Sequence, residues 1–135
     1  CIVFNCGKIQ KLGCGVYSVG QKEYSLSAGD ISLFGGDEVH CLTDISDGFL
    51  ILSIHFKPNL LWSDSDAFFV LRLFFARSGK FENRLARNEH TRALHESIVR
   101  LTGELSDRRD GYARMVKYIL FSSLLTIVRE YDYID

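Results

Sequence analysis

The stretch from Gly29 to His40, GDISLFGGDEVH, constrains the fold of this chain more than any other. Gly29 permits backbone angles that a Cβ would forbid, and the pair Gly35-Gly36 marks a second chain reversal. Between the two turns, the residues of Ile31–Phe34 alternate between two faces, which is the period-two pattern of a short strand. The stretch therefore predicts a strand between tight turns, with His40 opening the next strand.

Further strand patterns lie on both sides of this stretch. The segments 12–19 and 23–27 flank a turn at Gly20 and predict a hairpin. The segment 49–56 is nearly continuous apolar sequence, as expected for a strand covered on both faces, and Pro58 ends it. Within this segment Ser53 and His55 share one face. A barrel wall that contacts a ligand would show such a polar pair, but a lone Ser and a lone His near a strand end are more often satisfied within the protein or exposed to solvent.

Three sequence motifs occur in a recognisable order: Gly20-x-x-x-Tyr24-x-Leu26, then Gly29-Asp30-Ile-x-Leu-Phe-x-x-x-Glu-Val-His40, then FLILSIHFKP ending at Pro58. With the late helical pair, this order resembles the sensing domains of AraC-type transcription regulators. The resemblance implies a mainly β fold with α structure at the C-terminal end, namely a cupin-like double-stranded β-helix barrel followed by an antiparallel helical pair. The barrel would span residues 1–87, with its closing strands between about Leu60 and Leu85. The helical pair would span residues 88–135 of the same structural domain.

From Asn88 the hydrophobic period becomes helical. Apolar residues at spacings of three and four predict one helix from Asn88 to Asp107 and a second from Asp110 to about Tyr131. The second helix is apolar over most of its circumference, more than one small barrel can cover, so we expect it to mediate a homodimer. The alternative is that the first helix and the barrel cover it. The residues predicted at the dimer contact are Met115, Ile119, Leu120, Leu124, Ile127 and Val128.

Composition excludes several classes of function. The formal net charge is −1, which gives no basic face for gripping nucleic acid. No apolar run reaches the roughly 18 residues that span a membrane. The four cysteines, Cys1, Cys6, Cys14 and Cys41, form no C-x-x-C pair, so we expect reduced thiols in the cytoplasm. Because the chain starts without methionine inside a strand pattern, we also expect residues upstream of Cys1.

The resemblance implies a function as well as a fold. A small-molecule effector, often a sugar in these proteins, would bind inside the barrel and bias the arrangement of a dimer. DNA would be read by a separate helix-turn-helix domain that this chain does not contain. The pocket predicted here is largely apolar, which weakens the case for a sugar, because buried hydroxyls need hydrogen-bond partners. From strand alternation and family position, the expected ligand contacts are His40, Leu42, Ser53, His55, Cys14 and Ser18.

Two alternative functions stay open. A metal-dependent cupin enzyme would need three or four ligands converging on one site, and His40 with His55 and Glu38 are the candidates. The chain contains no H-x-H motif, and residues 1–39 contain no histidine. We therefore predict no metal, no cofactor and no catalytic residues. The other alternative is a free-standing cupin module that binds a ligand without controlling transcription.

Overall fold

The computed structural model describes residues 2–5, 14–62 and 65–135, so Cys1 and Cys6 lie outside the described residues. The chain divides into two compact units. Residues 1–55 and 83–87 form the first unit, and residues 56–82 and 88–135 form the second. The segment 56–82, assigned to the barrel from the sequence, therefore groups with the helices.

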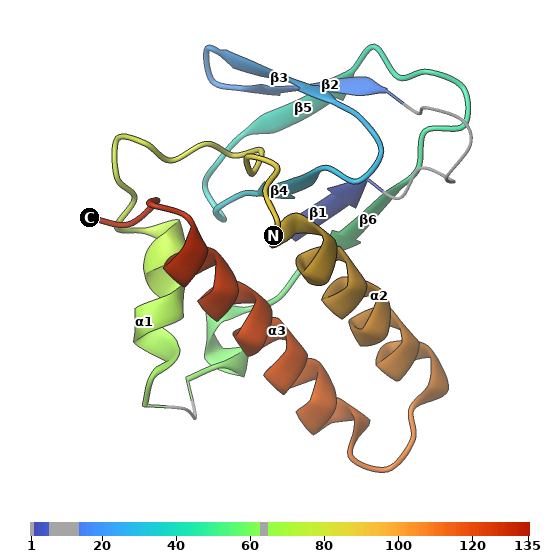
Figure 1. Cartoon of the computed structure of the whole chain (residues 1–135), viewed down its shortest axis with the longest axis vertical. Helices are drawn as coiled ribbons and strands as arrows, with labels where there is room; N and C mark the ends of the chain where they lie inside the picture. The colour runs from blue at the N-terminus through green and yellow to red at the C-terminus, as the bar shows by residue number, and fades with distance from the viewer. Residues whose placement is uncertain (1, 6–13, 63–64) are drawn as a thin grey trace. The chain divides into compact units, whose positions relative to one another are not determined.

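Among the described residues of the first unit, six strands form two antiparallel sheets. One sheet has the order β3-β2-β5, and the other has the order β4-β1-β6 (Figure 1). The strands are β1 (Ile2–Asn5), β2 (Gly15–Val19), β3 (Lys22–Leu26), β4 (Ile31–Leu33), β5 (His40–Thr43) and β6 (Ile51–Ile54). The predicted hairpin is present, because β2 pairs with β3 across the turn at Gly20, whose φ is +59°.

The β3-β2-β5 sheet buries one of its two faces. Tyr17, Tyr24 and Leu26 on this face form a hydrophobic cluster with Phe34, and Val19, Leu42 and Phe49 pack against the cluster. Directly opposite residues of antiparallel strands share a face, so the pairs Tyr17–Leu42 and Val19–His40 lie on the cluster side. The pair Ser18–Cys41 lies on the other face.

The segment 83–87 runs beside β4 and covers the edge that β1 leaves open. The backbone N–H of Leu33 donates to the Asn83 carbonyl at 2.8 Å, and the N–H of Leu85 donates to the Ile31 carbonyl at 2.9 Å. Ser32 and Arg84 form an antiparallel bridge between these bonds. All three residues of β4 are buried as a result. A neighbour from 50 residues further along the chain therefore completes the environment of this strand.

The predicted cupin-like barrel is wrong for the described residues, and so is the mainly β assignment. The strands form two separate three-stranded sheets and do not close. The segment expected to supply the closing strands is helical instead: η1 (Pro58–Leu60), α1 (Ala67–Leu71) and η2 (Arg72–Phe74). Ala67, Val70 and Leu71 are buried at the i, i+3, i+4 spacing of a helix. A short apolar run is compatible with either a strand or a helix, so its period could not decide between them.

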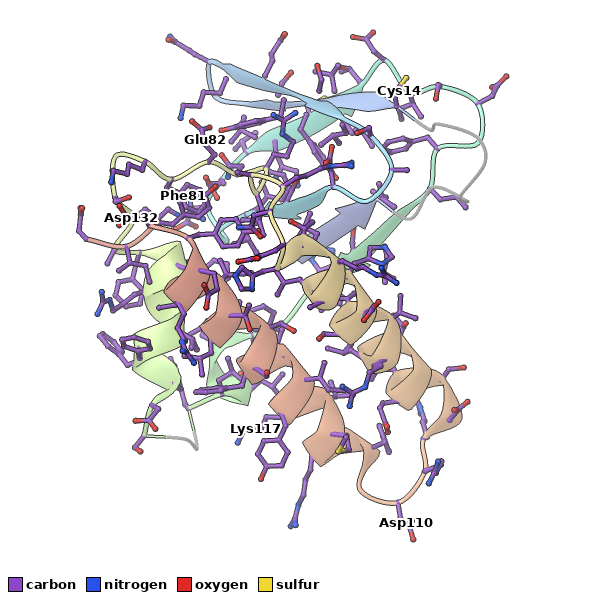
Figure 2. The ribbon with its side chains drawn as sticks, in the orientation of Figure 1. Cys14, Phe81, Glu82, Asp110, Lys117 and Asp132 are labelled. Atoms are coloured by element: carbon purple, nitrogen blue, oxygen red, sulfur yellow. The ribbon has the colours of Figure 1, made fainter. Side chains whose placement is uncertain are left out.

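Two long helices follow where the period predicts them, α2 (Thr91–Asp107) and α3 (Tyr112–Glu130). They pack side by side in the second unit, joined by a short turn that contains Asp110 (Figures 1 and 2). The start of α3 differs from the prediction, because Gly111, with a φ of +82°, is its N-cap and not Asp110. Asn88 stabilises the start of α2 by accepting a hydrogen bond from the His90 N–H at 2.8 Å.

The C-terminal residues of the second unit pack against the segment before residue 82. The N–H of Ser78 donates to the Tyr133 carbonyl at 2.9 Å, and Arg77 forms an antiparallel bridge with Ile134. The rings of Phe81 and Tyr133 meet edge to face at 5.3 Å, in the region where Figure 2 labels Phe81 and Asp132. This segment is thereby tied to the end of α3. Among the described helices, none has the length and apolar character needed to cross a bilayer.

Candidate functional site

The Gly29 turn is held by an ion pair between the buried Asp30 carboxylate and the exposed Arg87 side chain. Gly29 has a φ of +89°, which only glycine adopts without strain, and it leads into Asp30, which is 5% exposed. The Arg87 Nε donates to Asp30 Oδ1 at 2.8 Å, and the Ser27 N–H donates to Asp30 Oδ2 at 2.8 Å. Both carboxylate oxygens of Asp30 are therefore satisfied. The turn fixes the direction in which β4 enters the fold.

The loop after β4 is fastened by Glu38. Its carboxylate accepts hydrogen bonds from the Gly35 N–H at 2.5 Å and from the Asn83 Nδ2 at 3.0 Å. Asn83 is 5% exposed, and its Nδ2 also donates to the Leu33 carbonyl at 2.9 Å. One buried amide therefore connects the end of β4 to the loop. This arrangement places the backbone of Val39 and His40 at the start of β5.

The His40 ring is held by two contacts. It stacks on the ring of Phe34 with 3.9 Å between centroids and 8° between planes, and Tyr17 meets it edge to face at 5.8 Å. His40 Nδ1 lies 3.0 Å from the Glu38 carbonyl oxygen. Because a carbonyl only accepts, we assign the hydrogen to Nδ1, which leaves Nε2 of the neutral ring as an acceptor. Phe34 is fully buried, whereas His40 is exposed, so one ring face is packed and the side chain still reaches solvent.

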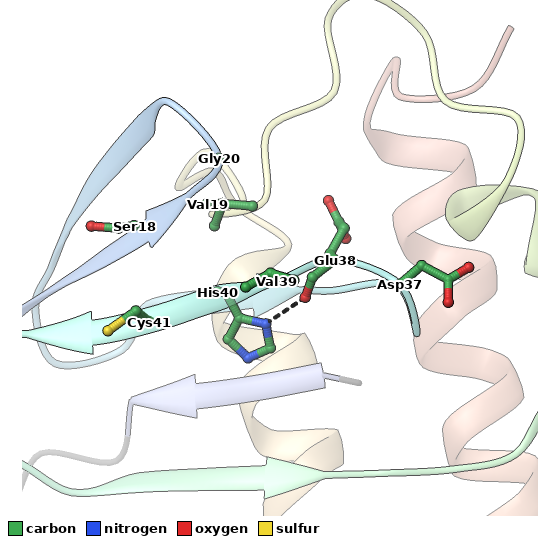
Figure 3. Close-up of a pocket in the computed structure, with 8 residues that line it drawn as sticks. All are labelled: Ser18, Val19, Gly20, Asp37, Glu38, Val39, His40 and Cys41. Carbon is green, nitrogen blue, oxygen red and sulfur yellow. Dashed lines mark hydrogen bonds between the residues drawn. The ribbon is translucent and has the colours of Figure 1, made fainter.

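A hollow of about 610 Å³ lies where the end of β2 meets the start of β5 (Figure 3). We call it the β2–β5 hollow. The strand register forms it, since Val19 pairs with His40 and Ser18 with Cys41. The loop before β5 supplies the rest of the wall, and Figure 3 shows the hydrogen bond between the His40 ring and the Glu38 carbonyl. The lining residues are Ser18, Val19, Gly20, Asp37, Glu38, Val39, His40 and Cys41.

Of the six ligand contacts predicted from the sequence, two line the β2–β5 hollow, Ser18 and His40. Ser53 is exposed in β6, an edge strand of the other sheet, and His55 is exposed just after this strand; neither lines the hollow. Leu42 packs in the hydrophobic cluster. Cys14 is exposed, and its backbone N–H donates to Ser46 Oγ at 2.9 Å. The structure thus separates residues that strand alternation and family position had grouped.

Sequence reasoning missed Asp37 and the apolar lining, and it considered Glu38 only as a candidate metal ligand beside His40 and His55. Asp37 and Glu38 follow the Gly35-Gly36 pair within the stretch from Gly29 to His40. Two acidic residues after a glycine pair are typical of an ordinary turn, so their types did not indicate a binding site. Val19 and Val39 were missed because their contribution depends on strand register and not on residue type. The usable signal was the position of Asp37 and Glu38 within three residues of His40.

The residues predicted for the dimer contact are mostly covered within this chain. Ile119, Leu120, Leu124 and Ile127 are buried, at 6%, 1%, 0% and 1% exposure. α3 packs against both α2 and α1, which supplies the cover that the sequence argument sought in a second chain. Met115 is exposed at 38%, and Val128 is half-buried. Dimerisation stays a prediction, and four of its six proposed contacts are inaccessible unless the helices separate.

The lining of the β2–β5 hollow combines polar and apolar side chains. Within residues 2–5, 14–62 and 65–135, no three His, Cys, Asp or Glu side chains cluster closely enough to hold a metal ion. The lining offers two carboxylates, one imidazole, one hydroxyl and one thiol. Beneath the hollow, burial raises the pKa of Tyr17 above its ordinary value of 10, so this phenol stays neutral at physiological pH.

No family model matches the chain, and no curated protein matches it. The geometry of the β2–β5 hollow and the order of the sequence motifs are the observations on which a function can be based.

Proposed function

We propose that this chain is the small-molecule-sensing domain of an AraC-type transcription regulator, with the β2–β5 hollow as its effector site. The observation that carries the proposal is the position of the hollow. Four consecutive residues of the motif behind the AraC resemblance, Asp37 to His40, form its wall together with the end of β2. Its volume of about 610 Å³ lies in the range typical of small-molecule sites, about 300 to 1,000 Å³.

The barrel interior is not part of this proposal, because the strands do not close. The effector binds instead at an outer corner of the β3-β2-β5 sheet, above a cluster of buried aromatic rings. That cluster gives the site a rigid floor, which limits the entropy lost on binding. A ligand there contacts both a strand end and the loop that Glu38 and Asn83 fasten. It can therefore stabilise one arrangement of that loop over another, as a sensing function requires.

The remaining parts of the proposal come from the resemblance. They are a homodimer, a cytoplasmic location, and DNA recognition by a helix-turn-helix domain outside this chain. The four cysteines form no C-x-x-C pair, which supports a reducing compartment. The net charge of −1 supports the view that this segment does not itself bind DNA.

Mapping ligand contacts by NMR tests the proposal. The ¹⁵N-labelled chain is titrated with a panel of small metabolites that covers sugars, organic acids and amines. A true effector shifts the amide signals of Val39, His40 and Cys41. His40→Ala removes the imidazole that lines the hollow and is expected to weaken binding roughly tenfold, the value of a well-placed aromatic contact.

His55→Ala is the matched control, because His55 is an exposed histidine of the same unit outside the β2–β5 hollow. It should leave the affinity unchanged. The proposal is wrong if no compound shifts the Val39 to Cys41 amides. It is also wrong if His55→Ala weakens binding while His40→Ala does not, since that result favours the β6 wall predicted from the sequence.

A further inference from the structure

The segment that contains α1 and η2 is apolar on its inner side and on its outer side. Residues 67–75 have the sequence AFFVLRLFF, in which Arg72 is the one charged residue. Ala67, Val70 and Leu71 are buried, and α1 packs against α3 in the same unit (Figure 1). A helix that is apolar around its whole circumference is usually buried on all sides. Contact with α3 accounts for the inner side only.

Three phenylalanine rings lie on the outer side of this segment. Phe68, Phe69 and Phe75 are 67%, 45% and 58% exposed. The rings of Phe68 and Phe75 contact each other, with 5.0 Å between their centroids, although one belongs to α1 and the other follows η2. The Arg72 guanidinium lies 5.4 Å from the centroid of the Phe69 ring. We call these four residues, Phe68, Phe69, Arg72 and Phe75, the phenylalanine face.

The one charge on the phenylalanine face is engaged within the chain. Arg72 Nη2 donates to the backbone carbonyl of Asp135 at 3.1 Å, and the same guanidinium lies over the Phe69 ring. A single engaged charge gives the face little attraction for a strongly charged partner such as nucleic acid. The surface that matches it is another apolar, aromatic surface. An identical face on a second copy has this character, and two-fold dimers are the commonest oligomers.

The exposed area fits a weak dimer. An aromatic side chain can bury about 200 Å², so the three exposed rings present roughly 350 Å² of apolar surface on each copy. Because roughly 60% of a protein–protein interface is apolar, two such faces correspond to a contact of about 1,100 to 1,200 Å² in total. This area lies at the lower bound for a specific interface, where weak and reversible complexes are found.

We propose that the phenylalanine face is the contact through which two copies of this chain form a reversible homodimer. This inference rests on the homodimer in the proposed function and moves its contact from α3 to α1 and η2. In a two-fold dimer the same face of each copy meets the other, so the rings of one copy pack against those of its partner. The buried residues of α3 stay inside their own chain, and the dimer forms without separating the helices.

Sedimentation velocity of the full chain, at concentrations from about 5 to 500 µM, measures the association of so small an interface. The chain is expected to change from monomer to dimer within this range. Dilution of the ¹⁵N-labelled chain supplies a second readout. The amide signals of residues 67–75 should move with concentration, whereas those of Val39, His40 and Cys41 should keep their positions.

Phe68→Ser removes one ring of the face from each copy. It is expected to weaken the dimer at least roughly tenfold, because both sides of the contact lose an aromatic side chain. Tyr118→Ser is the matched control, since Tyr118 is an aromatic residue of the same unit with a similar exposure of 62%, but lies on α3. It should leave the dissociation constant unchanged. Both side chains are exposed, so the circular dichroism spectra of the two variants should match that of the original chain.

The outcomes separate this inference from the proposed function. An unchanged dissociation constant in Phe68→Ser overturns the inference, and weakening by Tyr118→Ser alone returns the contact to α3. A chain that stays monomeric at every concentration overturns the inference and the homodimer together. If this monomer binds phosphatidylcholine vesicles through Phe68, the face contacts lipid, and the inference is again wrong. The effector site is tested separately, by the metabolite titration of the Val39 to Cys41 amides.

Discussion

Replacing Asn83 by aspartate removes the link between β4 and the loop that carries the β2–β5 hollow. The substitution keeps the shape of the side chain but exchanges the amide NH₂ for an oxygen. Asn83 Nδ2 donates to the Leu33 carbonyl at 2.9 Å and to Glu38 Oε1 at 3.0 Å, and both bonds are lost. A neutral hydrogen bond contributes about 1 kcal/mol and a bond to a charged acceptor about 2 kcal/mol. Asn83→Asp is therefore expected to cost about 3 kcal/mol before repulsion from Glu38 is counted.

Urea denaturation followed by circular dichroism measures this loss. With a slope of about 2 kcal/mol per molar urea, the midpoint should fall by about 1.5 M. The new carboxylate lies beside that of Glu38, so a proton is bound more tightly in the folded state than in the unfolded chain. The deficit is then largest at pH 7 and shrinks as the pH falls towards about 4, where protonation removes the repulsion and restores one donor.

Asn59→Asp is the control for this experiment, since Asn59 is exposed in η1 and undergoes the same chemical change. It should shift the stability by no more than about 0.5 kcal/mol. The reasoning is refuted if the two variants have the same midpoint, or if the Asn83→Asp deficit grows on acidification. A further readout is the His40 amide signal, which should broaden when Glu38 no longer fastens the loop.

Three further predictions concern the core, the Gly29 turn and the pH dependence of stability. Leu124→Asp places a charge at a site with 0% exposure and should unfold the second unit without giving a folded monomer. Val99→Asp, at a site with 53% exposure, is the control and should be tolerated. Circular dichroism and sedimentation distinguish these results. Arg87→Ala leaves the buried Asp30 carboxylate without its ion-pair partner and should lower the free energy of unfolding in urea by about 1 to 3 kcal/mol. If Arg87→Ala lowered it equally in an Asp30→Asn background, the two residues would not be coupled. Because burial raises the pKa of Tyr17 in the folded chain, the neutral Tyr17 contributes fully to stability below pH 10, and this contribution is lost as the pH rises above 10. If the Tyr17→Phe variant had the same midpoint of alkaline unfolding as the original chain, this reasoning would be contradicted.

Part of the candidate site could be predicted from the sequence. The turns at Gly20 and Gly29 and the strand that begins at His40 follow from residue types that tolerate few conformations. The sequence also shows that Asp37 and Glu38 lie within three residues of His40. That these residues share one hollow with Ser18 was not, because it depends on how β2 and β5 pair, and 20 or more residues separate the partners.

The sequence by itself determined the elements whose period is local. α2 and α3 lie where apolar residues repeat at three and four positions, since a helix closes its hydrogen bonds within its own segment. Only the tertiary structure decided which strands pair and what each face meets. β4 takes a neighbour from the segment 83–87, and Ser53 lies exposed on an edge strand instead of facing a barrel interior. The physical reason is that strand pairing and burial depend on residues far apart in the chain. The pattern of a single strand therefore does not identify the strand with which it pairs.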